Sequence, residues 1–275
     1  MPETQTQTVN AHQIAAACLA LAAAQALAQA APAQTVPSLC AASSGAVKAP
    51  VIELYTSEGC SSCPPADKWL STFKNSSVKP GSTVDAAEVA PVVQAFHVGY
   101  WDYIGWVDRF ASPAHTTRQR QIAANNRQSS IYTPQAVLDG RDWRDWNRTG
   151  SGRLAGRREP AEAHIKLSQV AANQFEALVT PSEGLTSAWS AYWTLTEDGH
   201  SSKVKSGENA GELLQHDFVV RQYNAAGDFS AGAKSPQKLV WRSIAPTPGH
   251  TRRVNLVVFD TRSGKTLQAV SAMCG

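Results

Sequence analysis

From about residue 50 the chain has an apolar run, then a turn with two cysteines, and then an amphipathic segment. The run VIELYT at 51–56 is rich in β-branched and aromatic residues, which predicts a strand. The sequence C-S-S-C-P-P follows soon after, and prolines fit the first turn of a helix because no amide partner is lost there. Trp69, Leu70 and Phe73 then give this helix one apolar face. The pattern predicts a strand-to-helix junction with Cys60 at the amino terminus of the helix.

Further strand and helix patterns follow up to about residue 160. PVVQAFHVGYW at 91–101 predicts a buried strand, and a helix is expected to begin near Ser112, where a proline follows. The run IYTPQAVLDG predicts a strand that Pro134 interrupts early and an Asp-Gly turn closes. Residues 141–160 are rich in Arg, Gly and Trp and predict a helix only weakly.

The last part of the chain is a series of short runs in which apolar and polar residues alternate. Gly, Asn, Asp and Pro clusters separate these runs, as turns separate the strands of an all-β domain. The runs are HIKLSQV, QFEALVT, SAWSAYWTLT, LLQHDFVVRQY, KLVWRS, RRVNLVVFD and TLQAVSAM.

The amino terminus resembles an export signal. Residues 14–24 are an uninterrupted apolar run, and small-x-small sequences end at Ala28 and Ala30. The run is too short to span a hydrocarbon core of about 30 Å. Residues 1–30 are therefore expected to be a cleaved signal peptide, and the Ala-, Ser- and Pro-rich residues 31–49 a tether. Because no Lys or Arg precedes the run, an Ala-rich surface helix or an uncleaved anchor remains an alternative.

Composition narrows the function classes. Charged residues make up 17% of the chain and the formal net charge is +3, which is too small and too dispersed for a nucleic-acid-binding surface. The content of apolar residues, 43%, is ordinary for a globular protein and excludes long disorder, collagen and coiled coil. We therefore expect no nucleic-acid partner and, after signal cleavage, no stable membrane anchor.

The C-x-x-C sequence at Cys60 and Cys63 is the strongest chemical signal. A zinc site needs three or four ligands, and the chain has no second C-x-x-C. A preceding strand, a following helix and a downstream Pro in a strand are typical of a thioredoxin-like redox motif. The helix amino terminus favours the thiolate, so Cys60 is the expected nucleophile and Cys63 the expected resolving thiol. A structural disulfide between the same residues is the alternative.

The predicted fold class is therefore α/β, with a thioredoxin-like domain followed by an all-β domain of sandwich or barrel type. The expected boundaries are residues 50–160 for the first domain and 161–275 for the second. No internal repeat of fixed period is visible in the sequence.

Two further segments are expected to lie beside the cysteine pair. Thr133-Pro134 is predicted to be a cis peptide that leaves the backbone before it free to pair with a bound chain. The segment after His97 carries four aromatic residues and Asp102 just beyond a strand, where open sheets bind ligands. Asp102 or His97 is a candidate proton carrier, whereas the alternative is a set of loop aromatics that cover the core. The predicted substrate-binding residues are Thr133, Pro134, Tyr100, Trp101 and Asp102.

A copper carrier is a further possibility, because thiolate and imidazole suit copper. Its ligands would be Cys60, Cys63 and His97. No Met-rich tract supports this interpretation, and no other cofactor is expected.

The two remaining cysteines of the mature chain predict a structural disulfide. Cys40 and Cys274 lie near its two ends, and domain termini often lie close together. If Cys60 and Cys63 pair with each other, Cys40 and Cys274 are left in a compartment where disulfides persist. Exposed ends that never meet, or an intermolecular bridge, are the alternatives.

Four blocks carry a resemblance to a known family: ELYTSEGCSSCPPAD, FHVGYWDYIGW, YTPQAVLDG and GENAGELL-x-HDFVVR. The chain resembles the secreted bacterial thioredoxin-like proteins catalogued as domain of unknown function 1223, over about residues 50–272. The resemblance implies a thioredoxin-like domain followed by a β-rich domain particular to the family, and it implies no characterised reaction. Gly99 departs from the family pattern, which has an acidic residue there, so this loop is not expected to supply two carboxylates. The matching residues are Cys60, Cys63, Pro64, Pro65, His97, Tyr100, Trp101, Asp102, Trp106, Thr133, Pro134 and Gln135.

Together these observations predict an exported thiol–disulfide oxidoreductase, located in the periplasm or secreted. The expected partner is a protein or a small thiol or disulfide compound. The alternatives are a non-catalytic periplasmic binding module, in which the Cys60–Cys63 disulfide is structural, and the copper carrier.

Overall fold

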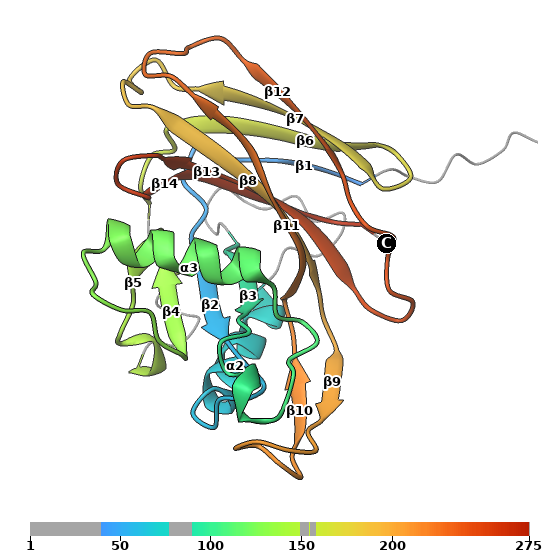
Figure 1. Ribbon diagram of the computed structural model, residues 1–275. Helices are drawn as coiled ribbons and strands as arrows, with labels where there is room; N and C mark the ends of the chain where they lie inside the picture. The colour runs from blue at the N-terminus through green and yellow to red at the C-terminus, as the bar shows by residue number, and fades with distance from the viewer. Residues whose placement is uncertain (1–39, 77–89, 149–153, 155–157, 275) are drawn as a thin grey trace, which may run out of the picture. The chain divides into compact units, whose positions relative to one another are not determined.

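An eight-stranded sheet runs through the residues that the computed structural model describes, which are 40–76, 90–148, 154 and 158–274 (Figure 1). The strand order is β14-β13-β8-β11-β3-β2-β4-β5. In this sheet β3 is parallel to β2 and to β11, and the other neighbours are antiparallel. The strands are β2 (Val51–Thr56), β3 (Val92–His97), β4 (Gln135–Leu138), β5 (Arg141–Asp142), β8 (Trp189–Glu197), β11 (Val219–Phe229), β13 (Arg252–Asp260) and β14 (Thr266–Met273).

Two smaller sheets complete the β structure of the described residues. The four-stranded sheet has the order β1-β6-β7-β12, and β9 and β10 form a separate hairpin. The strands are β1 (Ala41–Ser43), β6 (Ala163–Ala171), β7 (Gln174–Pro181), β9 (His200–Lys203), β10 (Leu213–His216) and β12 (Gln237–Arg242). The α-helices in this part of the chain are α2 (Pro64–Ser71) and α3 (Pro113–Asn125).

The two helices cover opposite faces of the eight-stranded sheet. Successive side chains of a strand point to opposite faces, so β2 supplies both. Ile52 packs in one hydrophobic cluster with Leu70 of α2, whereas Tyr55 packs in another with Ile122 of α3. Figure 1 shows α3 lying across β4, β2 and β3. The strand that precedes Cys60 is therefore fixed on both sides.

The four-stranded sheet packs on strands from the last part of the chain. Trp193 of β8 and Leu256 of β13 belong to the same buried cluster as Phe175 of β7 and Trp241 of β12. The rings of Trp193 and Trp241 are stacked, with their centroids 5.5 Å apart. Side chains of the two sheets thus form one apolar layer. This is expected when two sheets pack face to face and the apolar residues of their strands point inward.

The predicted fold class is wrong. Strands in three sheets are the main regular structure of the described residues, which also contain two α-helices, and these residues show no thioredoxin-like α/β fold followed by an all-β sandwich or barrel. Val219 of β11 pairs with Ala95 of β3, which places strands from both sides of residue 160 in one sheet. Residues 141–148 form β5 and a short 3-10 turn instead of a helix. Local periodicity predicts that a segment is a strand, but it does not identify the distant strand with which it pairs.

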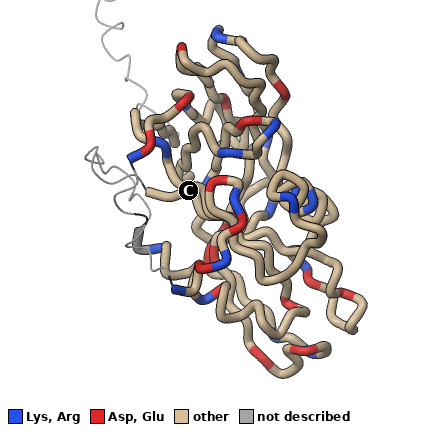
Figure 2. The backbone as a smooth tube through the Cα atoms, turned by 90° about the vertical axis from the view of Figure 1, so that its left-hand side faces the viewer, with Lys and Arg blue, Asp and Glu red and all other residues tan. Residues whose placement is uncertain are grey.

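The predicted signal peptide, residues 1–30, lies outside the described residues. Of the predicted tether, the described part includes β1, which pairs with β6 from Ala41 to Ser43. No helix in the described ranges combines the length and the apolar character needed to cross a membrane. Figure 2 shows Lys and Arg residues interspersed with Asp and Glu residues along the described chain.

A buried ion pair joins α3 to the sheet. The Arg118 guanidinium donates to both oxygens of the Glu53 carboxylate, at 2.8 and 2.6 Å. The hydroxyl of Tyr55 donates to the same carboxylate at 2.7 Å, and that of Tyr192 does so at 3.3 Å. The guanidinium carbon also lies 3.9 Å from the centroid of the Tyr192 ring. One buried charge pair therefore connects β2, α3 and β8.

Replacing Arg118 with Met is expected to lower the free energy of unfolding by about 3–5 kcal/mol, because it leaves the Glu53 carboxylate buried without its cation. Arg120, which is exposed on the same helix, provides the matched control Arg120→Met, with an expected change within about 0.5 kcal/mol. Urea unfolding measures both variants. Equal stability of the two variants would show that the buried pair does not hold α3 on the sheet.

A disulfide joins the two ends of the described chain. Cys40 and Cys274 are bonded, with their Cα atoms 5.3 Å apart and a sequence separation of 234. Cys274 is 1% exposed and lies in the apolar layer between the sheets. This is the pair that the sequence predicts, and it holds β1 beside the end of β14.

The double substitution Cys40→Ala, Cys274→Ala is expected to lower the free energy of unfolding by about 2–5 kcal/mol, since the bond closes a very long loop. The measurement is urea unfolding without reductant, with Cys60 and Cys63 left intact. A non-reduced peptide map gives an independent check. Free thiols at both positions in protein from an oxidising compartment would contradict the bridge.

Candidate functional site

The turn between β2 and α2 contains the cysteine pair. Cys60 and Cys63 form a disulfide, and Cys63 is the N-cap residue of α2. The Cys63 N–H donates to the Cys60 carbonyl at 3.1 Å, and the Asp67 N–H donates to the Cys63 carbonyl at 3.1 Å. Pro64 occupies the first turn, where a missing N–H costs nothing. Cys60 therefore precedes a helix amino terminus, where the backbone favours negative charge.

The tip of the β9–β10 hairpin holds this turn. Glu208 accepts a hydrogen bond from the Ser61 N–H at 2.8 Å. The side-chain amide of Asn209 donates to the carbonyls of Glu58 at 2.8 Å and Cys60 at 3.1 Å. These contacts all go to the backbone on either side of Cys60. The hairpin thus fixes the main chain of the pair, although it lies about 150 residues later in the sequence.

Both cysteines are buried in this disulfide-bonded form. Cys60 is 1% exposed and Cys63 is 0% exposed, whereas Ser61 and Ser62 between them are exposed. Cys60 Sγ lies 3.4 Å from the Ser62 hydroxyl.

The loop after β3 approaches the turn closely. A Cβ built on Gly59 would lie 3.0 Å from Cβ of Trp101, so this close approach favours glycine immediately before Cys60. The Trp101 indole N–H donates to the Thr133 hydroxyl at 2.7 Å. The peptide between Thr133 and Pro134 is cis. Three of the predicted substrate-binding residues therefore meet next to the cysteine turn.

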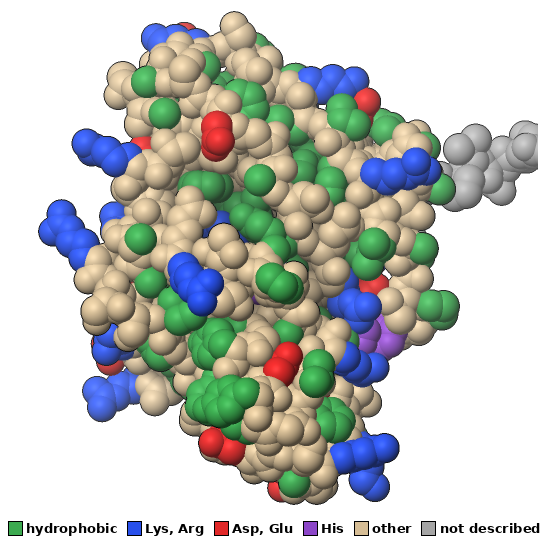
Figure 3. Space-filling view, viewed as in Figure 1, with side chains coloured by type: hydrophobic (Ala, Val, Ile, Leu, Met, Phe, Trp, Pro, Cys, Tyr) green, Lys and Arg blue, Asp and Glu red, His purple; other side chains and the backbone are tan. Residues whose placement is uncertain are grey.

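The other two predicted substrate-binding residues lie in the same loop. Asp102 accepts a hydrogen bond from the Asp108 N–H at 3.2 Å, and burial raises the pKa of its carboxyl. Burial also raises the pKa of Tyr100. Tyr103 and Val107 are 82% and 70% exposed. Figure 3, which has the same view as Figure 1, shows hydrophobic side chains on the lower part of the molecule. Figure 1 places α2 and the loop after β3 in that region.

A buried acid–base cluster lies behind the turn. Nε2 of His216 is 3.4 Å from Oε1 of Glu58, and its Nδ1 is 3.6 Å from Oδ2 of Asp67. These distances are long for hydrogen bonds but suit ion pairs. The ring of His97 lies 4.8 Å from that of His216, and Nδ1 of His97 is 2.7 Å from Oδ2 of Asp108.

Charge in this cluster changes the pKa of its members. Burial lowers the pKa of His216, but the carboxylates of Asp67 and Glu58 outweigh it and raise the pKa to about 9. For Glu58, burial raises the pKa, and the nearby His216 ring together with donors such as the Trp106 indole N–H brings the net pKa below its usual range. For Asp108, burial raises the pKa, and His97 lowers it to a net value below the usual range. His216 is therefore an imidazolium at neutral pH.

The structure does not support the copper ligand set. Within the ranges described, no three His, Cys, Asp or Glu side chains are arranged to hold a metal ion.

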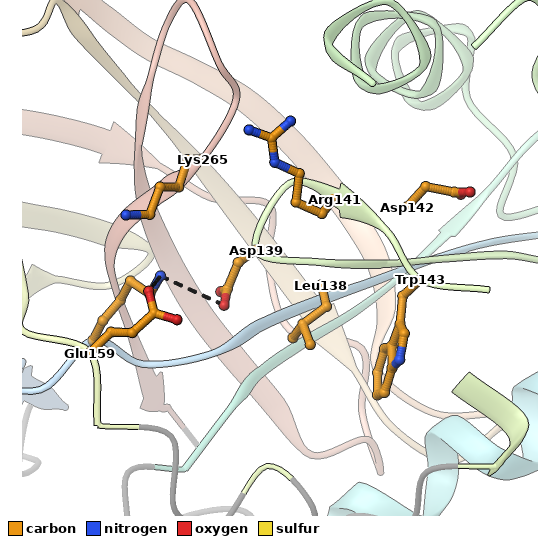
Figure 4. Close-up of a pocket in the computed structure, with 8 residues that line it drawn as sticks. Leu138, Asp139, Arg141, Asp142, Trp143, Glu159 and Lys265 are labelled. Atoms are coloured by element: carbon orange, nitrogen blue, oxygen red, sulfur yellow. Dashed lines mark hydrogen bonds and ion pairs between the residues drawn. The ribbon is translucent and has the colours of Figure 1, made fainter. Parts of the chain in front are cut away.

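A second location is a cleft of about 250 Å³ that none of the predicted site residues lines (Figure 4). Lys48 lies 2.6 Å from Glu159 and 3.8 Å from Asp139, so its charge is already paired. Figure 4 shows Leu138 and Trp143 on the other side of the cleft. Three basic and three acidic residues line this cleft, so its lining carries no net formal charge.

Sequence reasoning missed the residues that the hairpin contributes. Glu208, Asn209 and His216 follow the cysteines by about 150 residues and lie in the segment assigned to a separate β-rich domain. All three are in the block GENAGELL-x-HDFVVR, which carries part of the family resemblance. That block could have indicated them, since it is polar and adjoins an alternating strand.

Comparisons with known proteins place the chain in a family and show two structures with a similar fold. The family described as "Protein of unknown function (DUF1223)" matches residues 51–259. An X-ray structure of a protein from Agrobacterium tumefaciens is similar, with 23% identity and a TM-score of 0.55, over 83% of this chain and 95% of that chain. HBP35 of Porphyromonas gingivalis is 11% identical with a TM-score of 0.53, over 82% of this chain and 75% of that chain. No curated protein matches the chain significantly. Identities this low show a shared fold alone.

The ion-paired His216 is expected to make stability depend on pH. Its pKa is about 9 in the folded chain against 6.5 for the free side chain, so the folded state retains a proton that the unfolded state releases. The stabilisation, at most about 3 kcal/mol, is complete below about pH 6.5 and is lost as the pH rises through about 9. Urea unfolding at several pH values measures the difference in the free energy of unfolding between the wild type and His216→Gln.

The matched control is His164→Gln, which removes a half-buried histidine of β6 that contacts the hydroxyls of Ser43 and Ser44. If the wild type exceeded His216→Gln in free energy of unfolding by the same amount at low and high pH, the result would contradict the ion pair.

Proposed function

Because the chain belongs to the DUF1223 family, whose description gives no activity, we propose its function from the site: thiol–disulfide exchange by Cys60 and Cys63. The observation that carries this proposal is the disulfide between two cysteines three residues apart, immediately before α2. The helix amino terminus supports the role of Cys60, since it favours a thiolate, the form that attacks disulfides.

The reaction requires the reduced pair and one substrate disulfide. The Cys60 thiolate attacks a substrate sulfur, a mixed disulfide forms, and the first substrate thiolate leaves and takes a proton. Cys63 loses its proton and attacks the Cys60 sulfur, which re-forms the Cys60–Cys63 bond and releases the second substrate thiolate. Two electrons pass to the substrate, and a dithiol reductant restores the pair. In the opposite direction the same steps oxidise a substrate dithiol.

The surroundings of the pair support a protein or small thiol compound as substrate. Thr133, Pro134 and Trp101 meet beside the turn, and we assign them with Tyr100 and Asp102 to substrate contact. An oxidising location, periplasmic or secreted, is part of the proposal and accords with the apolar run at residues 14–24.

A structural disulfide is the second candidate, and the burial of both cysteines favours it. Cys60 and Cys63 are 1% and 0% exposed, and Asn209 binds the backbone around them. In that case the pair stabilises the turn of a binding protein and undergoes no exchange.

Substituting each cysteine separates the two candidates. Cys63→Ser is expected to accumulate a mixed disulfide through Cys60, because attack proceeds without resolution. Cys60→Ser is expected to lose exchange activity. The measurements are turnover in insulin reduction by the wild type and mass spectrometry of Cys63→Ser after incubation with oxidised glutathione.

The matched control is the double variant Cys40→Ala, Cys274→Ala, which keeps the candidate pair and is expected to retain turnover. Absence of turnover in the wild type, together with no adduct on Cys63→Ser, would favour the structural disulfide.

A further inference from the structure

Two buried carboxylates flank the cysteine pair in sequence, and the Asp67 N–H donates to the Cys63 carbonyl. Glu58 precedes Cys60 by two residues, and Asp67 lies one helical turn after Cys63. Glu58 is 0% exposed and Asp67 is 6% exposed. A cysteine thiolate beside two buried negative charges would be disfavoured, because like charges repel strongly where water is excluded.

One cation faces both carboxylates. His216 is 2% exposed, and its two ring nitrogens approach Glu58 and Asp67 on opposite sides. It reaches this position from β10, because the hairpin folds back onto α2 and the turn.

The other titratable groups around His216 do not replace its charge. His97 of β3 lies beside the ring and is paired with Asp108, which adds a negative charge. His200 is the cross-strand partner of His216 on β9, and burial lowers its pKa to about 4, so it is neutral. Among the described residues, His216 is therefore the group that lies next to both Glu58 and Asp67 and supplies a positive charge to them.

We propose that His216 is a positioning residue for exchange at Cys60 and Cys63: its imidazolium neutralises Glu58 and Asp67 and thereby keeps the Cys60 thiolate accessible near neutral pH. The inference rests on the proposed function. It extends the site from the two cysteines to a charge that the last part of the chain provides.

The test measures the thiolate itself. The reduced wild type and His216→Gln are alkylated with iodoacetamide over a range of pH, and mass spectrometry follows the peptide that contains Cys60. His216→Gln is expected to react about tenfold more slowly near neutral pH, because its thiolate fraction is smaller. Equilibration with glutathione is expected to show that the disulfide of His216→Gln is harder to reduce. His164→Gln serves as the control.

A second variant tests whether removing a negative charge has the opposite effect on the reactivity of Cys60. It also keeps the proposal testable if His216→Gln does not fold. Asp67→Asn removes one carboxylate and keeps the imidazolium, so alkylation of Cys60 near neutral pH is expected to become faster. A folded His216→Gln with the wild-type pH profile, or an Asp67→Asn that reacts more slowly, would overturn the proposal.

These outcomes differ from a failure of the proposed function. If insulin turnover and adduct formation are absent while His216→Gln still slows the alkylation of Cys60, the charge effect stands and the exchange activity does not. If turnover is present and the alkylation profile is unchanged, the exchange activity stands and His216 has a structural role alone.

Discussion

The buried contact between Glu53 and Arg118 is the constraint on which the rest of the structure depends. A guanidinium and a carboxylate removed from water require each other, and here Tyr55 and Tyr192 also satisfy the carboxylate. Because Tyr192 belongs to β8, this cluster connects the early strands to the late strands. The strand that leads to Cys60 is fixed by groups that lie far away in the sequence.

This connection explains how the hairpin reaches the cysteines. β8 ends at Glu197 and β11 begins at Val219, and the hairpin consists of the chain between them. Val219 pairs with Ala95 on β3, which is itself the neighbour of β2. The hairpin therefore emerges at the end of the sheet where β2 turns toward α2. Sheet order, and not sequence proximity, brings Asn209 and His216 to the site.

Local sequence rules predicted those parts of the structure that depend on neighbouring residues. Helix α3 begins directly after Ser112, near the expected start, and the C-x-x-C turn lies at the start of α2. The fold class was wrong because the pairing of β11 with β3 joins residues that no local pattern relates. The role of His216 was missed for the same reason, since a histidine in an alternating strand shows nothing of the carboxylates it will face.

The burial of Cys60 and Cys63 is compatible with thiol–disulfide exchange, because a local opening of the hairpin tip costs little free energy. The hairpin tip holds the turn through three hydrogen bonds, which involve Glu208 and Asn209, and residues 205–208 and 210–212 of this tip are exposed or half-buried. A hydrogen bond contributes about 1 kcal/mol net, so releasing all three costs a few kcal/mol. Local openings of that size occur without global unfolding. The core beneath the turn, which depends on Ile52 and Leu70, would remain packed during such an opening. The same hairpin can therefore hold the turn and also carry His216, which we propose neutralises Glu58 and Asp67.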